Sequence, residues 1–131
     1  MAPLSLVAGN RKKSNPMRTV SNFESALIEA VAAHLPAISA SQLQADLAYA
    51  TAVEMGTGGA RVGFVISGYE RPPYQGQHAY PVELLMQDAD GAELTPILHA
   101  DANDRLLELA IIRWEGAELI SPQIESLICY A

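Results

Sequence analysis

The amino-acid sequence predicts an α+β domain in which an N-terminal helix, or two helices, precede an antiparallel sheet of about five strands. A helix start signal and an apolar stripe of helical period occupy residues 21–35. From residue 47 onward, apolar residues alternate with small or polar ones, which is the period of a strand. Apart from the loop at residues 68–81, the connections between these later segments are short, and short connections favour antiparallel over parallel pairing.

The first helix is predicted over residues 22–35. Ser21 and Glu24 have the spacing of a capping box, in which each side chain binds the other residue's backbone amide. Pro36 then ends the helix because proline has no backbone donor and disfavours helical backbone in the residue before it. Residues 39–46 are compatible with a turn or a short second helix.

Four strands are predicted after residue 46. Residues 47–53 and 62–66 form a hairpin around the glycines near residue 57, and two further strands occupy residues 82–87 and 92–100. Pro96 falls inside the last of these, which favours a position at a sheet edge or a bulge.

The C-terminal part of the sequence is less regular. Residues 105–114 match both a helical stripe and a strand, and the short connection before them favours a fifth strand. Ser121 and Pro122 form a helix start signal, so the sequence predicts a short C-terminal helix that packs Ile124, Leu127 and Ile128 inward.

Charge divides the 131 residues into two parts: residues 1–20 read as a flexible basic arm, and residues 21–131 read as a single domain. Four of the eight Lys and Arg residues lie before residue 19, whereas all fifteen Asp and Glu residues lie after it. Residues 19–131 therefore contain four basic and fifteen acidic residues, which gives them a net charge of −11. Met17 is an alternative first residue, which would make residues 1–16 an upstream extension.

This charge and the hydropathy pattern exclude several classes of partner. A strongly acidic body repels nucleic acid and anionic membranes and favours a basic protein partner. The sequence contains no apolar run long enough to span a membrane. Its basic cluster follows the first apolar stretch, whereas a secretory signal has the opposite order. We therefore expect a cytoplasmic protein.

No catalytic, metal-binding or cofactor-binding motif is present in the sequence. The turn at Asp88 resembles the start of a calcium loop, but Ala92, Glu93 and His99 occupy the positions where that loop needs an oxygen ligand, glycine and glutamate. The single cysteine, Cys129, and the three histidines have no zinc-ligand spacing. We predict no catalytic residue, no metal and no cofactor.

Residues that would contact a partner are expected in one long loop and two acidic turns. The loop at residues 68–81 contains three tyrosines and an arginine, which are residue types enriched at protein interfaces. The turns add carboxylates for a basic partner. The predicted partner-binding residues are Glu70, Arg71, Tyr74, His78, Asp88, Asp90, Asp101 and Asp104.

Residues 43–119 resemble a group of small bacterial domains of unknown function, some of which are encoded beside polymorphic toxins as immunity proteins. The resemblance rests on the glycine-rich segment from Glu54 to Ala60, on the two aspartate turns, and on the apolar stretch 107–113. It implies a protein that neutralises a toxin by direct binding, without catalytic residues of its own.

The first hypothesis is therefore an acidic immunity protein that binds a basic toxin, such as a nuclease. A second is a small enzyme or ligand-binding domain that uses the 68–81 loop. A third is a self-associating structural module, in which an edge strand pairs across a homodimer.

Overall fold

The computed structural model describes residues 16–56 and 60–131, and these fold into two helices and an eight-stranded antiparallel sheet. The elements are β2 (Met17–Thr19), α2 (Asn22–Ala32), α3 (Ala37–Ala48), β3 (Ala50–Met55), β4 (Arg61–Ile66), β5 (His78–Ala79), β6 (Glu83–Gln87), β7 (Glu93–Ala100), β8 (Leu106–Arg113) and β9 (Gln123–Tyr130).

The predicted fold class is wrong, because the sheet dominates the described residues and the helices are a minor part. The sheet has eight strands instead of about five, and its first strand precedes the helices. β2 has three residues and β5 has two, so both are too short to show the alternation that identifies a strand in sequence. β9 takes the place of the predicted C-terminal helix.

An irregularity in strand pairing explains why β9 looks helical in sequence. The register between β6 and β9 shifts between Leu85, which pairs with Ile128, and Gln87, which pairs with Gln123. Four residues of β9, 124–127, therefore oppose the single residue Met86 of β6, and the side-chain alternation is broken. As a result Ile124 and Leu127, three residues apart, both pack against the core and mimic a helical stripe. Ile128 is 50% exposed, so its predicted inward packing is wrong.

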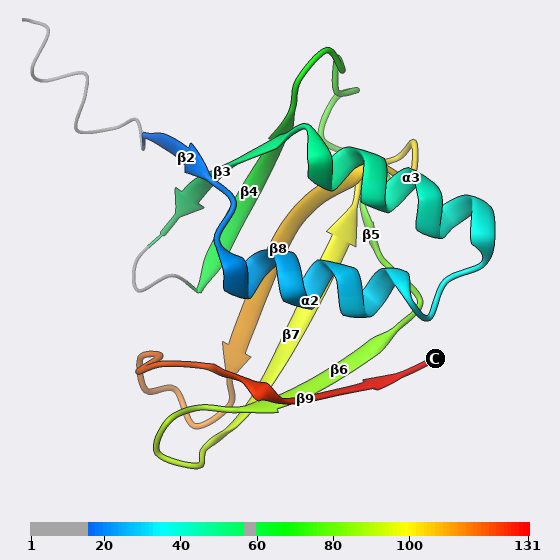
Figure 1. Ribbon diagram of the computed structural model, residues 1–131. Coiled ribbons are helices and arrows are strands. Elements are labelled where there is room, and N and C mark those ends of the chain that lie inside the picture. Colours follow the sequence, from blue (N-terminus) through cyan, green and yellow to red (C-terminus); the bar gives the residue numbers. More distant parts are fainter. Residues whose placement is uncertain (1–15, 57–59) are drawn as a thin grey trace, which may run out of the picture.

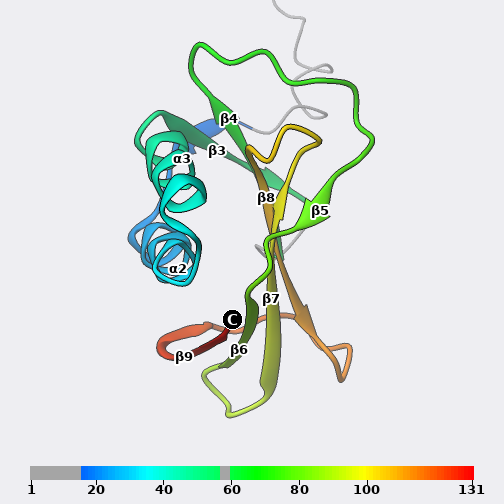
Figure 2. The same cartoon turned by 90° about the vertical axis from the view of Figure 1, so that its right-hand side faces the viewer.

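Both helices lie on one face of the sheet. The strand order is β2-β3-β4-β8-β7-β6-β9, and β5 pairs with β7. Figure 1 shows α2 in front of the middle strands, with β9 passing beneath it. Figure 2 shows the sheet nearly edge-on, with the two helices on one side and the segment between β4 and β5 arching out on the other. Within residues 16–56 and 60–131, no helix lies over the second face of the sheet.

The capping box predicted at Ser21 is confirmed. The Ser21 hydroxyl accepts from the Glu24 amide at 3.1 Å, and the Glu24 carboxylate accepts from the Ser21 amide at 2.9 Å. The helix buries Leu27, Ile28 and Val31 against the sheet. It ends at Ala32, before Pro36, and Pro36 becomes the N-cap of α3.

Within the predicted arm, residues 1–15 lie outside the described residues, and Met17–Thr19 form β2, which pairs with β3. Residues 57–59 of the predicted glycine hairpin also lie outside them, although the antiparallel pairing of β3 with β4 on either side is confirmed. The strand predicted within 105–114 is confirmed as β8. In the part of the chain that the structure covers, neither helix combines the length and apolar character needed to span a membrane.

Candidate functional site

The sheet face opposite α2 and α3, which we call the helix-free face, carries both hydrophobic and charged side chains. Directly paired residues of antiparallel strands share a face. Leu98 and Leu109 pair in the core, so their neighbours Ile97 and Ala110, which also pair, lie on the helix-free face. This face carries hydrophobic side chains beside its charged ones, whereas an ordinary solvent-facing sheet would be mainly polar.

Large hydrophobic side chains on the helix-free face are exposed to solvent. Ile128 and Tyr130 of β9 are each 50% exposed, and they pair with Leu85 and Glu83 of β6. Trp114 is 68% exposed and donates through Nε1 to the Thr95 hydroxyl at 2.7 Å. Exposed apolar surface that is contiguous on one face and edged by polar residues is typical of a protein-interaction site.

A groove of about 370 Å³ opens on this face between β6 and β7. The two strands pair only at Met86 with Leu94 and at Gln87 with Glu93. Beyond this point β7 continues through Pro96, which has no backbone donor to extend the ladder. Pro96 thus lies in an interior strand next to a gap in pairing, and the edge position that the sequence suggests is wrong.

One ion pair lies in the middle of the helix-free face. Glu108 is 7% exposed, and Arg61 donates to its carboxylate from Nε at 3.3 Å and from Nη2 at 3.1 and 3.2 Å. His99 pairs with Glu108 across β7 and β8, and its Nδ1 is buried without a hydrogen-bond partner. A buried carboxylate in contact with a guanidinium organises this part of the sheet and gives it no net charge.

The structure brings the predicted residues Arg71 and Asp101 together. Asp101 is 4% exposed, and its Oδ2 accepts from Arg71 at 2.9 Å and from the Tyr69 hydroxyl at 2.7 Å. Arg71 also donates to the Phe64 carbonyl at 2.6 Å. Burial raises the pKa of the Asp101 carboxyl, but hydrogen bonds from Tyr69, from backbone amides and from Arg71 lower it by a larger amount. The pKa of Asp101 is therefore below its usual value. Both charges are therefore used to fix the 68–81 loop to the sheet.

His78 and Asp104 also meet, at the edge of a second groove of about 580 Å³ between β5 and the start of α3. His78 Nε2 lies 2.7 Å from Asp104 Oδ1, and its Nδ1 lies 3.0 Å from the Gly76 carbonyl. Both ring nitrogens face acceptors, which favours the imidazolium form. The Gly76 carbonyl first, and then Asp104, raise the pKa of His78. An imidazole bonded in this way is a clamp between two segments and not a free base.

Asp88 and Asp90 form a separate cluster at the opposite end of β7. Arg113 donates to Asp88 Oδ2 at 2.7 Å and to Asp90 Oδ2 at 2.7 Å, and it also contacts Glu115. Asp88 additionally accepts from the backbone amides of Ile120 and Ser121, at 2.9 and 2.6 Å. This buried carboxylate holds the connection from β8 to β9 in place.

The last two predicted residues, Glu70 and Tyr74, are exposed on the 68–81 loop. Tyr74 is 66% exposed. Both are accessible to a partner, but they belong to the loop and not to the strands that form the helix-free face.

All five arginines of the described residues form ion pairs with carboxylates, and these contacts decide which acids remain available. Their partners include Glu24, Asp46, Asp88, Asp101 and Glu108, all of which are buried. Seven acids have no arginine partner within residues 16–56 and 60–131, and all seven are exposed. They are Glu29, Glu70, Glu83, Glu93, Asp104, Glu118 and Glu125. Within the described residues the exposed surface is therefore acidic, because each arginine is already paired with a carboxylate of the same chain.

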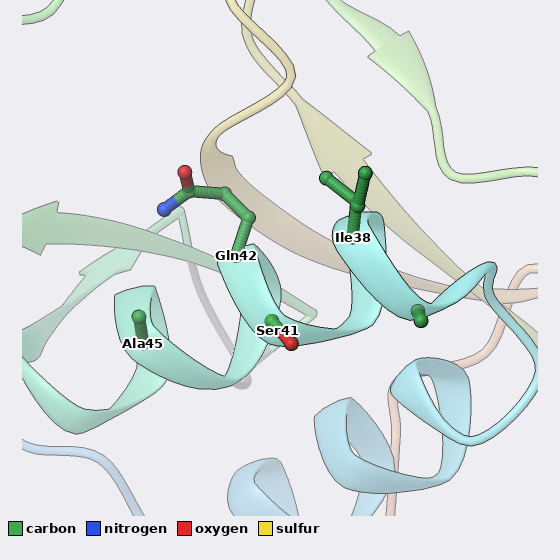
Figure 3. Close-up of a pocket in the computed structure, with 5 residues that line it drawn as sticks. Ile38, Ser41, Gln42 and Ala45 are labelled. Carbon is green, nitrogen blue, oxygen red and sulfur yellow. The ribbon is translucent and has the colours of Figure 1, made fainter.

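A third hollow, of about 420 Å³, runs along the exposed side of α3 (Figure 3). Its lining residues are Ala37, Ile38, Ser41, Gln42 and Ala45, none of which titrates. It therefore offers no acid–base chemistry. Throughout the described residues, no group of three or more His, Cys, Asp and Glu side chains is arranged to hold a metal ion.

Sequence reasoning missed the residues of the helix-free face, among them Glu83, Ile97, Trp114 and Tyr130. The sequence contains one signal for them, in the residues that alternate with the core positions of a strand. In β6 and β7 these include Leu85 and Ile97, where a solvent-facing sheet would carry polar side chains. To place these residues on one accessible face, one must know that β6 pairs with β9, and the sequence did not predict this pairing.

Comparison with known proteins gives a family without a known function. No curated protein and no solved structure matches the chain. A family model described as "Domain of unknown function (DUF6984)" matches residues 17–123. The match extends from the start of β2 to the first residue of β9 and so includes both helices and both acidic turns. The chain belongs to this family of domains of unknown function, DUF6984.

Proposed function

We propose that this domain is an acidic binding protein that acts in the cytoplasm and neutralises a basic toxin by covering it with the helix-free face. One observation carries the proposal: the arginines are paired internally, so seven exposed carboxylates have no arginine partner among the described residues, while one sheet face exposes hydrophobic side chains. A surface of this kind matches a partner that is both basic and partly apolar.

The acidic surface supports a basic partner over a second copy of this chain. Glu83 and Glu93 lie on or beside the helix-free face and are exposed. In a homodimer through this face, the carboxylates of both copies would approach each other, which costs free energy. Against a basic partner the same groups attract, and they also accelerate association.

Toxin neutralisation requires binding and no chemistry, which agrees with the clusters described above. Asp88, Asp101 and His78 are all bound to other groups of this chain, so they stabilise loops and do not present a reactive constellation. A nuclease toxin has a basic substrate groove, and an acidic protein surface is complementary to it. The resemblance to immunity-associated domains adds the toxin as the class of partner.

Co-expression with the product of the neighbouring gene tests this proposal. We expect the two proteins to co-purify, and we expect the association rate to fall as ionic strength rises, because screening weakens the attraction between opposite charges. If the neighbouring product is no toxin and does not bind, the proposal is wrong. A homodimer detected by light scattering, with no binding of a basic protein, would contradict it as well.

A further inference from the structure

The groove between β6 and β7 is lined by apolar side chains, a carboxylate and an aromatic ring. Its buried lining consists of Tyr80, Val82, Leu84 and Pro96, and its more exposed lining includes Leu85, Ile97, Glu83 and Tyr130. The buried group closes the bottom of the groove with apolar atoms. The exposed group surrounds its opening on the helix-free face.

The carboxylate and the ring at the opening are neighbours. Glu83 and Tyr130 pair directly across β6 and β9, which places their Cβ atoms about 5 Å apart on the same face. Glu83 is exposed and has no ion-pair partner within the described residues. Tyr130 is half exposed, and a cation that lies over the face of a tyrosine ring is attracted to it.

These features together select one kind of occupant. A side chain that enters the groove needs an aliphatic part to contact Leu85 and Ile97 and a positive charge to reach Glu83. A guanidinium is planar, is weakly hydrated, stacks on aromatic rings and binds carboxylates with two donors. The volume of about 370 Å³ is large enough for one long side chain and small for a folded segment.

We infer that this groove binds an arginine side chain of the protein partner, with the aliphatic stem between Leu85 and Ile97 and the guanidinium at Glu83 and Tyr130. The inference rests on the proposed function, since it names the group of the basic partner that the helix-free face recognises. It explains why β7 carries Pro96 at an interior position: a continuous ladder between β6 and β7 would close the groove.

The test uses the full chain and a blocked peptide, acetyl-Gly-Arg-Gly-amide, followed by methyl NMR. We expect saturable shifts at the methyl groups of Leu85 and Ile97 and none at Ile38 on α3. The same peptide with citrulline, which has the shape of arginine without its charge, is expected to bind at least about fivefold more weakly, as is usual when a charge-assisted hydrogen bond is lost.

Glu83→Gln is expected to weaken arginine-peptide binding to the same extent, and the matched control Glu118→Gln, which removes an exposed charge outside the groove, is expected to leave it unchanged. Equal binding of the arginine and citrulline peptides, or equal binding by E83Q and wild type, would overturn the inference. The test of the proposed function is independent of this one. If the arginine peptide occupies the groove but no basic toxin binds, the arginine-binding groove is supported and the assignment of a toxin as partner is wrong.

Discussion

Arg105 and Asp46 join the first residues of β8 to the last turn of α3. Arg105 donates to the Asp46 carboxylate from Nη2 at 2.7 Å and from Nε at 2.9 Å, and the Leu106 amide donates to the other carboxylate oxygen at 3.0 Å. Arg105 also lies over the Tyr69 ring, with 4.2 Å between the guanidinium carbon and the ring centroid. One buried carboxylate therefore ties together a helix, a strand and the long loop.

Replacing Asp46 with asparagine is expected to destabilise the domain by about 3 kcal/mol, because Arg105 loses its counter-charge while it remains partly buried. Asp46 is 1% exposed, so water cannot take its place without local rearrangement. Urea unfolding measures the change. Glu118→Gln, an equal loss of charge at an exposed position, is expected to stay within about 0.5 kcal/mol of wild type. A loss below about 1 kcal/mol for D46N would show that this contact is not a main support of the fold.

Asp88 is expected to make the domain sensitive to acid. Burial raises the pKa of its carboxyl, but the amides of Ile120, Ser121 and Ala89, together with Arg113, lower it by a larger amount. The resulting pKa is about 2. Because the folded-state pKa is below the usual 3.8, the stabilisation is present above that value and is lost as pH falls toward 2. Asp88→Asn is expected to lower stability at neutral pH by about 3 kcal/mol.

Acid unfolding followed by circular dichroism checks this expectation. The stability of D88N should change less than that of wild type between about pH 4 and pH 2. Parallel acid profiles for the two proteins would show that Asp88 is not the group responsible.

His78 is expected to contribute a pH dependence of the opposite sign. Its pKa is raised in the folded protein, so its stabilisation is complete below the unfolded pKa of about 6.5 and is lost as pH rises through the higher folded value. Wild type should therefore lose more stability than His78→Gln between about pH 6 and pH 8.5. His34→Gln, at an exposed position after α2, is the control. The idea of a clamp is wrong if H78Q and wild type have the same slope.

Trp114 is the one tryptophan in the sequence and lies on the helix-free face, so it reports on binding there. At 68% exposure, its fluorescence should be quenched efficiently by acrylamide in the free protein. A partner that covers this face should shift the emission to shorter wavelength and protect it from quenching. Unchanged quenching in a complex with a tryptophan-free partner would place the interface elsewhere.

Local signals predicted the first helix and several strands, but not the fold class. Residues 105–114 match both a strand and a helix, so β8 is favoured only by the short connection before it. The capping box at Ser21 and Glu24 depends on four consecutive residues and is directly visible in sequence. The two acidic turns are visible for the same reason. In contrast, β2 and β5 are strands only because β3 and β7 pair with them, and β9 is recognisable only with its register shift.

The candidate site was harder to predict because it depends on the pairing of distant strands. The negative charge of the body is evident from composition, but composition does not show that Arg61, Arg71 and Arg113 are paired internally. Nor does it separate structural acids such as Asp88 from exposed ones such as Glu83. The groove exists because β6 and β7 diverge beyond Leu94, and the sequence indicates this only through Pro96.

Two isoleucines that differ mainly in location test the central claim most directly. Ile128 is 50% exposed on the helix-free face, whereas Ile120 is 62% exposed in the connection before β9, beside residues of α2. Isothermal titration calorimetry would compare Ile128→Arg with Ile120→Arg for binding to the proposed basic partner, the product of the neighbouring gene. We predict that I128R loses at least about tenfold in affinity and that I120R stays within about twofold of wild type. Equal affinities for the two variants, or a larger loss for I120R, would contradict binding through the helix-free face.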